Sequence, residues 1–252
     1  MKHTVLLALV LVGGCKFSPL MNRITVGEEP FAVVVGEGPD GRTDLFAVSA
    51  GGGLVTQLTF TLPVEVGPRL TANGGVLAFI RMRDTLPTTP REVVVMNLVS
   101  GGERSLPLPA DAGQPQQVGW SDDEATLYVR TERGTWAVAA PPAAAEAHPV
   151  AMGDAAADTA LTLWLGTPRF ARGISCGAGI CVITPRGDTT QLTPTGHHPL
   201  RWGTDSLAWF DGEVLMIRAL GPGGPRRMTW TSPPRHPRDG SYAKGAKPAT
   251  TP

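Results

Sequence analysis

The chain has 252 residues, with 22 Lys and Arg against 22 Asp and Glu, so its formal net charge is zero. A nucleic-acid-binding protein needs a basic surface to gather phosphates, so this balance argues against that class. Hydrophobic residues make up 42% of the chain, which is enough for one sizeable folded domain. The 31 glycines and 24 prolines indicate many turns, and the short apolar runs between them favour strands over long helices.

The N-terminus has the layout of a secretion signal. A basic start at Lys2 precedes an apolar run over residues 4–12, which is too short to span a bilayer as a stable anchor. Residues 12–15 (Val-Gly-Gly-Cys) resemble the lipobox of bacterial lipoproteins, in which small residues precede the lipid-modified cysteine. The resemblance implies a signal peptide over residues 1–14 and a lipidated cysteine, Cys15. An ordinary signal peptide with an incidental cysteine is the alternative.

Acyl chains such as palmitate on Cys15 would hold the protein at a membrane without a transmembrane helix. Residues 15–25 are expected to form the lipidated tether. Lys16 follows the cysteine where an aspartate would signal retention, and by analogy with Gram-negative sorting this favours the outer membrane. We therefore expect a protein of the bacterial cell envelope that faces the periplasm.

A turn motif recurs along the chain. Residues 120–129 (Trp-Ser-Asp-Asp-Glu-Ala-Thr-Leu-Tyr-Val) are typical of a strand end, an acidic turn and a second strand. Asn73 and Asp205 stand in similar turns before β-rich runs, as Asp123 does here. Because a short side-chain oxygen can bond the backbone two residues on, we interpret all three as turn formers. Metal binding is the alternative for these residues.

A second element repeats with the first. Thr-Gln-Leu-Thr at residues 56–59 recurs verbatim at 190–193, each time after a β-rich run and a glycine turn. Residues 92–102 and 214–224 are further copies of the strand and glycine turn. The copies are spaced at multiples of about 45 residues, a period that is typical of propeller blades.

Residues 120–123 (Trp-Ser-Asp-Asp) and 96–102 (Met-Asn through Gly-Gly) resemble the TolB-type β-propeller repeat, with Asp122 in place of the usual proline. The resemblance covers residues 26–231 and implies an all-β protein with about five four-stranded antiparallel blades, six being the alternative. A β-sandwich with similar strand spacing is the other fold considered. TolB has an additional N-terminal domain that this chain lacks, so TolB's own role is not carried over.

The two ends of the propeller region carry further expectations. A strand at residues 23–26 is expected to complete the final blade and close the ring. Residues 232–252 are rich in proline, glycine and charge, with little that could be buried. This composition predicts a disordered C-terminal tail.

Few residues suggest chemistry. Cys176 and Cys181 frame a short glycine-rich loop, and outside the cytoplasm such a pair readily forms a disulfide. His197 and His198 stand at the entry to the last blade's inner strand, where a channel mouth could use them to bind a metal or a partner carboxylate. Adjacent strand residues point to opposite sides, so incidental placement is the alternative. We predict no catalytic residue, metal site or cofactor.

Two functions follow from these observations. The first is a non-catalytic binding or scaffold lipoprotein, monomeric, whose propeller binds an envelope protein or peptide. The second is a small propeller enzyme acting on a glycan or peptide with carboxylates at the channel mouth. A pair of inward carboxylates about 5–10 Å apart would favour the enzyme, and a channel without them would favour binding.

Overall fold

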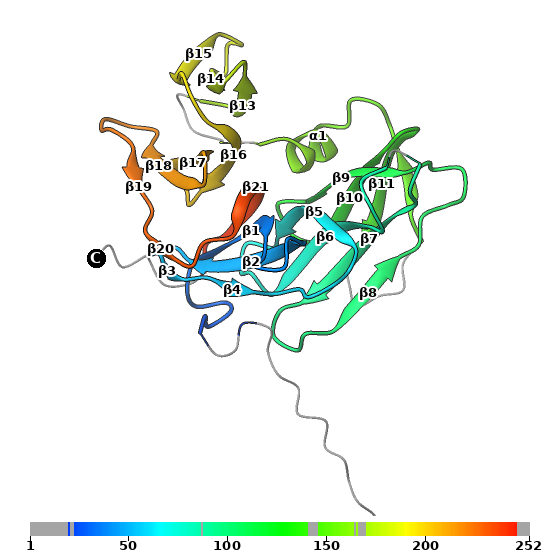
Figure 1. Ribbon diagram of the computed structural model, residues 1–252. Coiled ribbons are helices and arrows are strands. Elements are labelled where there is room, and N and C mark those ends of the chain that lie inside the picture. Colours follow the sequence, from blue (N-terminus) through cyan, green and yellow to red (C-terminus); the bar gives the residue numbers. More distant parts are fainter. Residues whose placement is uncertain are drawn as a thin grey trace, which may run out of the picture.

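The computed structural model describes residue 20 and residues 23–86, 88–140, 146–163, 165 and 170–245. It is a β-propeller of five blades around a central channel (Figure 1). The predicted all-β propeller is therefore confirmed, with five blades and not six. The predicted signal peptide over residues 1–14 and Cys15 lie outside the described residues. No helix in the described part of the chain is long and apolar enough to cross a membrane.

Each blade is an antiparallel sheet whose strands follow one another from the channel to the outer edge. Blade 1 consists of β21 (Arg235–Ala243), β1 (Phe31–Glu37), β2 (Thr43–Ser49) and β4 (Thr56–Gln57). Blade 2 consists of β5 (Val64–Leu70), β6 (Val76–Met82), β7 (Arg91–Asn97) and β8 (Glu103–Leu106). Blade 3 consists of β9 (Pro115–Trp120), β10 (Thr126–Thr131), β11 (Gly134–Ala139) and β12 (His148–Val150).

Blades 4 and 5 complete the ring. Blade 4 consists of β13 (Arg172–Cys176), β14 (Gly179–Ile183) and β15 (Thr189–Thr193), and blade 5 of β16 (His197–Trp202), β17 (Ser206–Asp211), β18 (Val214–Ala219) and β19 (Arg226–Arg227). A short parallel pair, β3 (Gly53–Leu54) with β20 (Trp230–Thr231), joins the outer parts of blades 5 and 1.

Among the described residues, blade 4 has three regular strands, and none of them is an innermost strand. The chain around Leu163 takes that place, because the Gly173 N–H donates to the Leu163 carbonyl at 3.0 Å and the Leu165 N–H donates to the Ala171 carbonyl at 2.8 Å. Helix α1 (Ala155–Leu161) comes just before it and packs against β9 and β10 of blade 3. The helix therefore fills the seam between blades 3 and 4.

Continuous apolar runs arise because each blade is covered on both faces. In β1, Phe31, Val33 and Val35 pack in the seam with blade 2, whereas Ala32 and Val34 pack in the seam with blade 5. Successive side chains of a strand point to opposite faces, so a strand buried on both faces needs apolar residues at every position. β6 and β17 divide their buried side chains between two seams in the same way.

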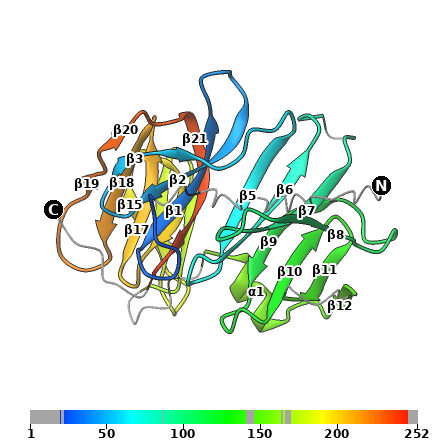
Figure 2. The same cartoon turned by 90° about the horizontal axis from the view of Figure 1, so that it is seen from below.

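The C-terminal strand closes the ring. β21 pairs with β1 from Phe31↔Ala243 to Glu37↔Arg235, so the last strand of the chain is the innermost strand of the first blade. Figure 2 shows the red end of the chain beside the blue start of blade 1. The predictions of a closing strand at 23–26 and of a disordered tail over 232–252 are therefore wrong for the residues described: residues 23–29 form bends and turns, and 235–243 form a strand.

The composition of β21 has a steric explanation. A Cβ atom on Gly240 would lie 3.1 Å from the Val33 carbonyl oxygen, which is tighter than an ordinary contact. The small side chain of Ser241 accepts a hydrogen bond from the Leu70 N–H of blade 2 at 2.9 Å. The strand is held by backbone pairing in a crowded centre, so it does not need the large apolar side chains whose absence suggested disorder.

The other predicted elements can be placed on the blades. Both Thr-Gln-Leu-Thr copies lie at outermost strands, β4 and β15, with Gln57 opposite Phe46 and Gln191 opposite Cys181. Cys176 and Cys181 are joined by a disulfide across the β13–β14 hairpin. The prediction of a tether over residues 15–25 is wrong for Leu20 and Ile24, which are buried in the seam between blades 1 and 2.

Removing the ring-closing strand should unfold the propeller. A chain that ends at residue 231 loses β21, which leaves the edge of β1 unpaired and opens the channel wall. We expect loss of the cooperative thermal transition measured by circular dichroism. A chain that ends at Gly245 keeps the whole strand and should melt as the full chain does. Equal melting temperatures for the two truncated chains would contradict this role of β21.

Candidate functional site

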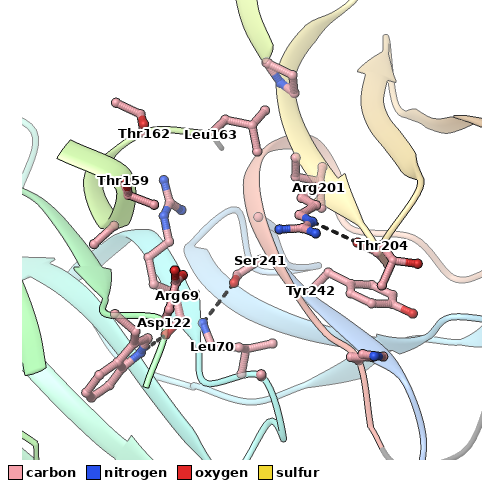
Figure 3. Close-up of a pocket in the computed structure, with 18 residues that line it drawn as sticks. Arg69, Leu70, Asp122, Thr159, Thr162, Leu163, Arg201, Thr204, Ser241 and Tyr242 are labelled. Carbon is pink, nitrogen blue, oxygen red and sulfur yellow. Dashed lines mark hydrogen bonds between the residues drawn. The ribbon is translucent and has the colours of Figure 1, made fainter. Parts of the chain in front are cut away.

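The channel widens into a cavity of about 450 Å³ at one end. The innermost strands β5, β9, β16 and β21 end there, and we call this end of the propeller the turn face. The cavity, named the turn-face mouth, is lined from every blade: by these four strands or the turns after them, and by α1 and Leu163 at the innermost place of blade 4. Figure 3 shows Arg69, Asp122, Thr159, Arg201 and Tyr242 around it.

The charged groups of the turn-face mouth are mostly cationic. Arg69 pairs with Asp239 at 3.1 Å, and both side chains are about one third exposed or less, at 28% and 32%. Arg201 donates from Nε to the Gly203 carbonyl at 3.0 Å. Within the described chain, neither Arg201 nor Lys244 has an acidic group within 4.0 Å. These two cations are therefore available to an anionic group of a ligand.

Side chain–backbone hydrogen bonds fix one side of the rim. The Trp120 indole of blade 3 donates from Nε1 to the Arg69 carbonyl of blade 2 at 2.9 Å. The Glu124 carboxylate accepts from the Ala72 N–H, and the Lys244 N–H donates to the Ala72 carbonyl at 2.9 Å. Blades 1, 2 and 3 are thus tied together at the mouth, which keeps its shape before any ligand arrives.

The turns that carry Asn73, Asp123 and Asp205 lie on this face. Asn73 Oδ1 accepts from the Gly75 N–H at 2.7 Å, and Asp123 Oδ1 accepts from the Ala125 N–H at 3.0 Å, so both bond the backbone two residues on, as predicted. Hydrogen bonds from the Ser121 hydroxyl and the Ala125 N–H hold the pKa of Asp123 below its usual range. Asp205 differs, since its carboxylate accepts from the Ser206 hydroxyl at 3.1 Å.

Asp122 lines the cavity beside the turn that Asp123 forms. The sequence motif therefore has two roles: Asp123 shapes the turn, and Trp120 and Asp122 face the space that the turn borders. Sequence reasoning treated the motif as a turn former only. A signal was present, because Asp122 replaces a proline that could not supply a charged group. Arg69, Arg201 and Lys244 carried no sequence signal.

The two histidines do not line this cavity, although the next residue, Pro199, does. His197 and His198 begin β16, whereas the cavity is lined by the end of the same strand, from Pro199 onward. Their rings meet edge to face at 5.0 Å, and His197 stacks on Phe210 at 6.0 Å. Burial and then the charge of His197 lower the pKa of His198. Asp239, which pairs with the cavity-lining Arg69, acts on His198 in the opposite sense, so His198 lies near the site without lining it. The predicted role of the two histidines in binding stays a prediction.

No three His, Cys, Asp or Glu side chains come together as a metal site within the described residues. The Gly-Ile-Ser-Cys-Gly stretch at 173–177 lies on β13 and the turn to β14, so a strand follows it where a nucleophile elbow would open a helix. The described side chains of the turn-face mouth can hydrogen bond and form ion pairs with a ligand.

A second polar cluster is buried where blade 1 meets blade 2, near the opposite face. Asp44 is fully buried and accepts hydrogen bonds from Gln57 Nε2 at 2.9 Å, the Thr59 hydroxyl at 3.3 Å and the Thr61 N–H at 3.3 Å. Glu65 is also fully buried and pairs with Arg81 at 2.6 Å. Burial raises the pKa of both carboxyls above their ordinary values of 3.8 and 4.5.

Comparisons with known proteins bear on the fold. No family model and no curated protein matches the sequence. A chain from the crystal structure of a nidogen/laminin complex is 8% identical, with a TM-score of 0.54 over 85% of this chain and 98% of that chain. TolB from Acinetobacter baumannii is 11% identical, with a TM-score of 0.47 over 87% of this chain and 67% of that chain. At such low identity the likeness shows the β-propeller fold alone.

The buried Asp44 predicts an acid-side pH dependence of stability. The pKa of Asp44 is raised in the folded protein, so protonated Asp44 stabilises the fold relative to the unfolded chain. This stabilisation is fully present below the ordinary pKa of 3.8 and is lost as pH rises through the raised pKa. Asp44→Asn cannot titrate, so the unfolding free energy of the wild type should fall relative to this variant over that window, as measured in urea at a series of pH values.

Asp44→Ala provides the control for the hydrogen bonds. It leaves the donors of Gln57, Thr59 and Thr61 without their acceptor and should be less stable than Asp44→Asn, which also does not titrate, by about 1–3 kcal/mol at any pH. A constant difference between the wild type and Asp44→Asn across the pH series would show that Asp44 does not titrate with folding.

Proposed function

We propose that this protein is a lipid-anchored, non-catalytic binding protein of the bacterial envelope. Its turn-face mouth would hold a peptide segment of a partner protein. One observation carries the proposal: a cavity of about 450 Å³ is lined by residues from all five blades and holds two cations that have no acidic partner among the described residues. Concave sites with a few placed polar groups are the usual form of binding pockets.

The groups around the mouth suit a peptide that carries a carboxylate. Arg201 and Lys244 would bind the carboxylate of an acidic side chain or of a chain terminus. Trp120 and Leu163, both partly exposed, offer apolar surface in the same cavity. Because the rim of blades 1 to 3 is already hydrogen bonded, the mouth would lose little entropy when it binds.

The enzyme alternative finds no support at the mouth. A glycosidase-like site needs two carboxyl groups that face one reacting bond. Among the described residues that line the cavity, Asp122 carries the only carboxylate, and the nearby Asp239 is paired with Arg69. This distribution of charge favours binding over hydrolysis.

The anchor is proposed from the lipobox at residues 12–15. Cys15→Ser should abolish metabolic labelling with a fatty-acid analogue and move the protein from the membrane fraction to the soluble one. Cys176→Ser with Cys181→Ser is the control, since it removes cysteines outside the motif and should leave the label in place. Labelling that survives in Cys15→Ser would contradict the anchor.

Binding at the mouth can be tested by site-specific cross-linking in cells. A photoreactive amino acid at Thr204, an exposed residue of the rim, should capture a partner that mass spectrometry identifies. The same amino acid at Asp40, in the exposed β1–β2 loop of the opposite face, should not capture it.

A charge reversal then tests the proposed chemistry. Arg201→Glu should reduce the affinity for the captured partner about tenfold or more, because one charge-assisted hydrogen bond is worth about 1.5–3 kcal/mol. Arg42→Glu makes the same change on the opposite face and should leave the affinity unchanged. Equal effects of the two variants, or capture only from Asp40, would contradict the proposed site.

A further inference from the structure

The N-terminal segment enters the propeller at the outer edge of blade 1. Leu20 is fully buried and Ile24 is 6% exposed, and both pack in the seam between blades 1 and 2. Arg23 donates from Nη1 to the Thr56 hydroxyl of β4, the outermost strand of blade 1, at 3.5 Å. Leu20 and Ile24 are thus packed into the propeller, and Arg23 lies beside β4.

In residues 59–62, which follow β4, the polar side chains point inward and the apolar ones point outward. Thr59 is 3% exposed and its hydroxyl bonds the buried Asp44, while the Thr61 hydroxyl donates to the buried Glu65 at 3.2 Å. The alternate residues Phe60 and Leu62 are 73% and 75% exposed. In a segment at a water-facing edge the apolar side chains would point inward and the polar ones outward.

The same edge holds a third apolar side chain. Leu54, on β3, is 48% exposed. Chain reach places Leu54 within about 7 Å and Phe60 within about 14 Å of Thr56, since each residue spans at most about 3.6 Å. Three large exposed apolar residues therefore lie along the short stretch of chain on either side of the strand that Arg23 contacts.

We infer that this edge lies against the lipid bilayer, with Leu54, Phe60 and Leu62 in the membrane interface. The inference rests on the proposed anchor. Cys15 precedes the buried Leu20 by so few residues that a fully extended chain would span about 18 Å at most. A lipid on Cys15 therefore keeps the edge next to the membrane. Exposed apolar side chains there would be stabilised by transfer from water into the membrane interface.

The orientation leaves the binding site open. Phe60 and Leu62 lie on the connection from β4, the outermost strand of blade 1, to the start of β5, the innermost strand of blade 2. The turn-face mouth opens at the other end of β5, where the innermost strands finish. With this connection against the bilayer, the turn-face mouth stays accessible to a partner while the protein remains anchored.

Depth-dependent quenching tests the inference on the lipidated full-length protein. Leu62→Cys and, as a matched control, Met152→Cys each carry an NBD label in vesicles of phosphatidylethanolamine and phosphatidylglycerol. Both positions are exposed, at 75% and 104%, so neither substitution should disturb folding, which a melting curve checks. The native Cys176 and Cys181 are disulfide-bonded and do not compete for the label.

The label at position 62 should shift its emission to the blue and be quenched by nitroxide-labelled lipid, and the label at position 152 should do neither. Equal spectra at the two positions in a protein whose intact mass shows the lipid would overturn the inference and leave the anchor standing. An intact mass without lipid would overturn both.

A lipid-free Cys15→Ala chain separates the bilayer from other occupants of the edge. In the absence of vesicles its label at position 62 should give the emission of a water-exposed dye at every protein concentration. A blue shift that grows with protein concentration would assign the edge to a second copy of the chain and overturn the bilayer as its occupant.

Discussion

The propeller depends on the pairing of its last strand with its first blade. A single blade leaves two apolar faces uncovered, and only a closed ring of neighbours covers all of them. β21 supplies the innermost strand of blade 1 and contacts β16 of blade 5 and β5 of blade 2, so it completes the channel wall as well as the sheet. The seams on both sides of β1 form only when this strand is in place.

The same closure creates the turn-face mouth. Ser241, Tyr242 and Lys244 belong to β21 or follow it directly, and they line the cavity together with residues from the other blades. The site is therefore a product of the whole ring, assembled from strands that are far apart in the sequence. Arg201 and Lys244, which have no acidic partner in the described part of the chain, come from blades 5 and 1, which meet because the ring is closed.

Sequence reasoning was sound wherever a local pattern has one structural meaning. The Thr-Gln-Leu-Thr repeat indicated the period of the blades, and the short apolar runs indicated strands. Asn73 and Asp123 were interpreted as turn formers, and both bond the backbone two residues on. The blade count followed from the repeat period. These features depend on the backbone geometry of one blade, which the local sequence encodes.

It failed where a residue's environment comes from another blade. β21 has the composition of a tail because neighbouring strands, and not its own side chains, provide its packing. Arg69, Arg201 and Lys244 are far apart in the sequence and belong to no motif, so no sequence pattern predicts that they line one cavity. The outward-facing Phe60 and Leu62 could not be recognised either, because their orientation follows from hydrogen bonds of Thr59 and Thr61 to residues on other strands.

Amide hydrogen exchange tests ring closure most directly. In the intact protein, the backbone amides of residues 235–243 should exchange as slowly as those of their partner strand, Phe31–Glu37, because the two strands open only together. Exchange over 235–243 at the rate of an unfolded peptide, with protection retained in β1, would contradict closure by β21 and with it the assembly of the turn-face mouth.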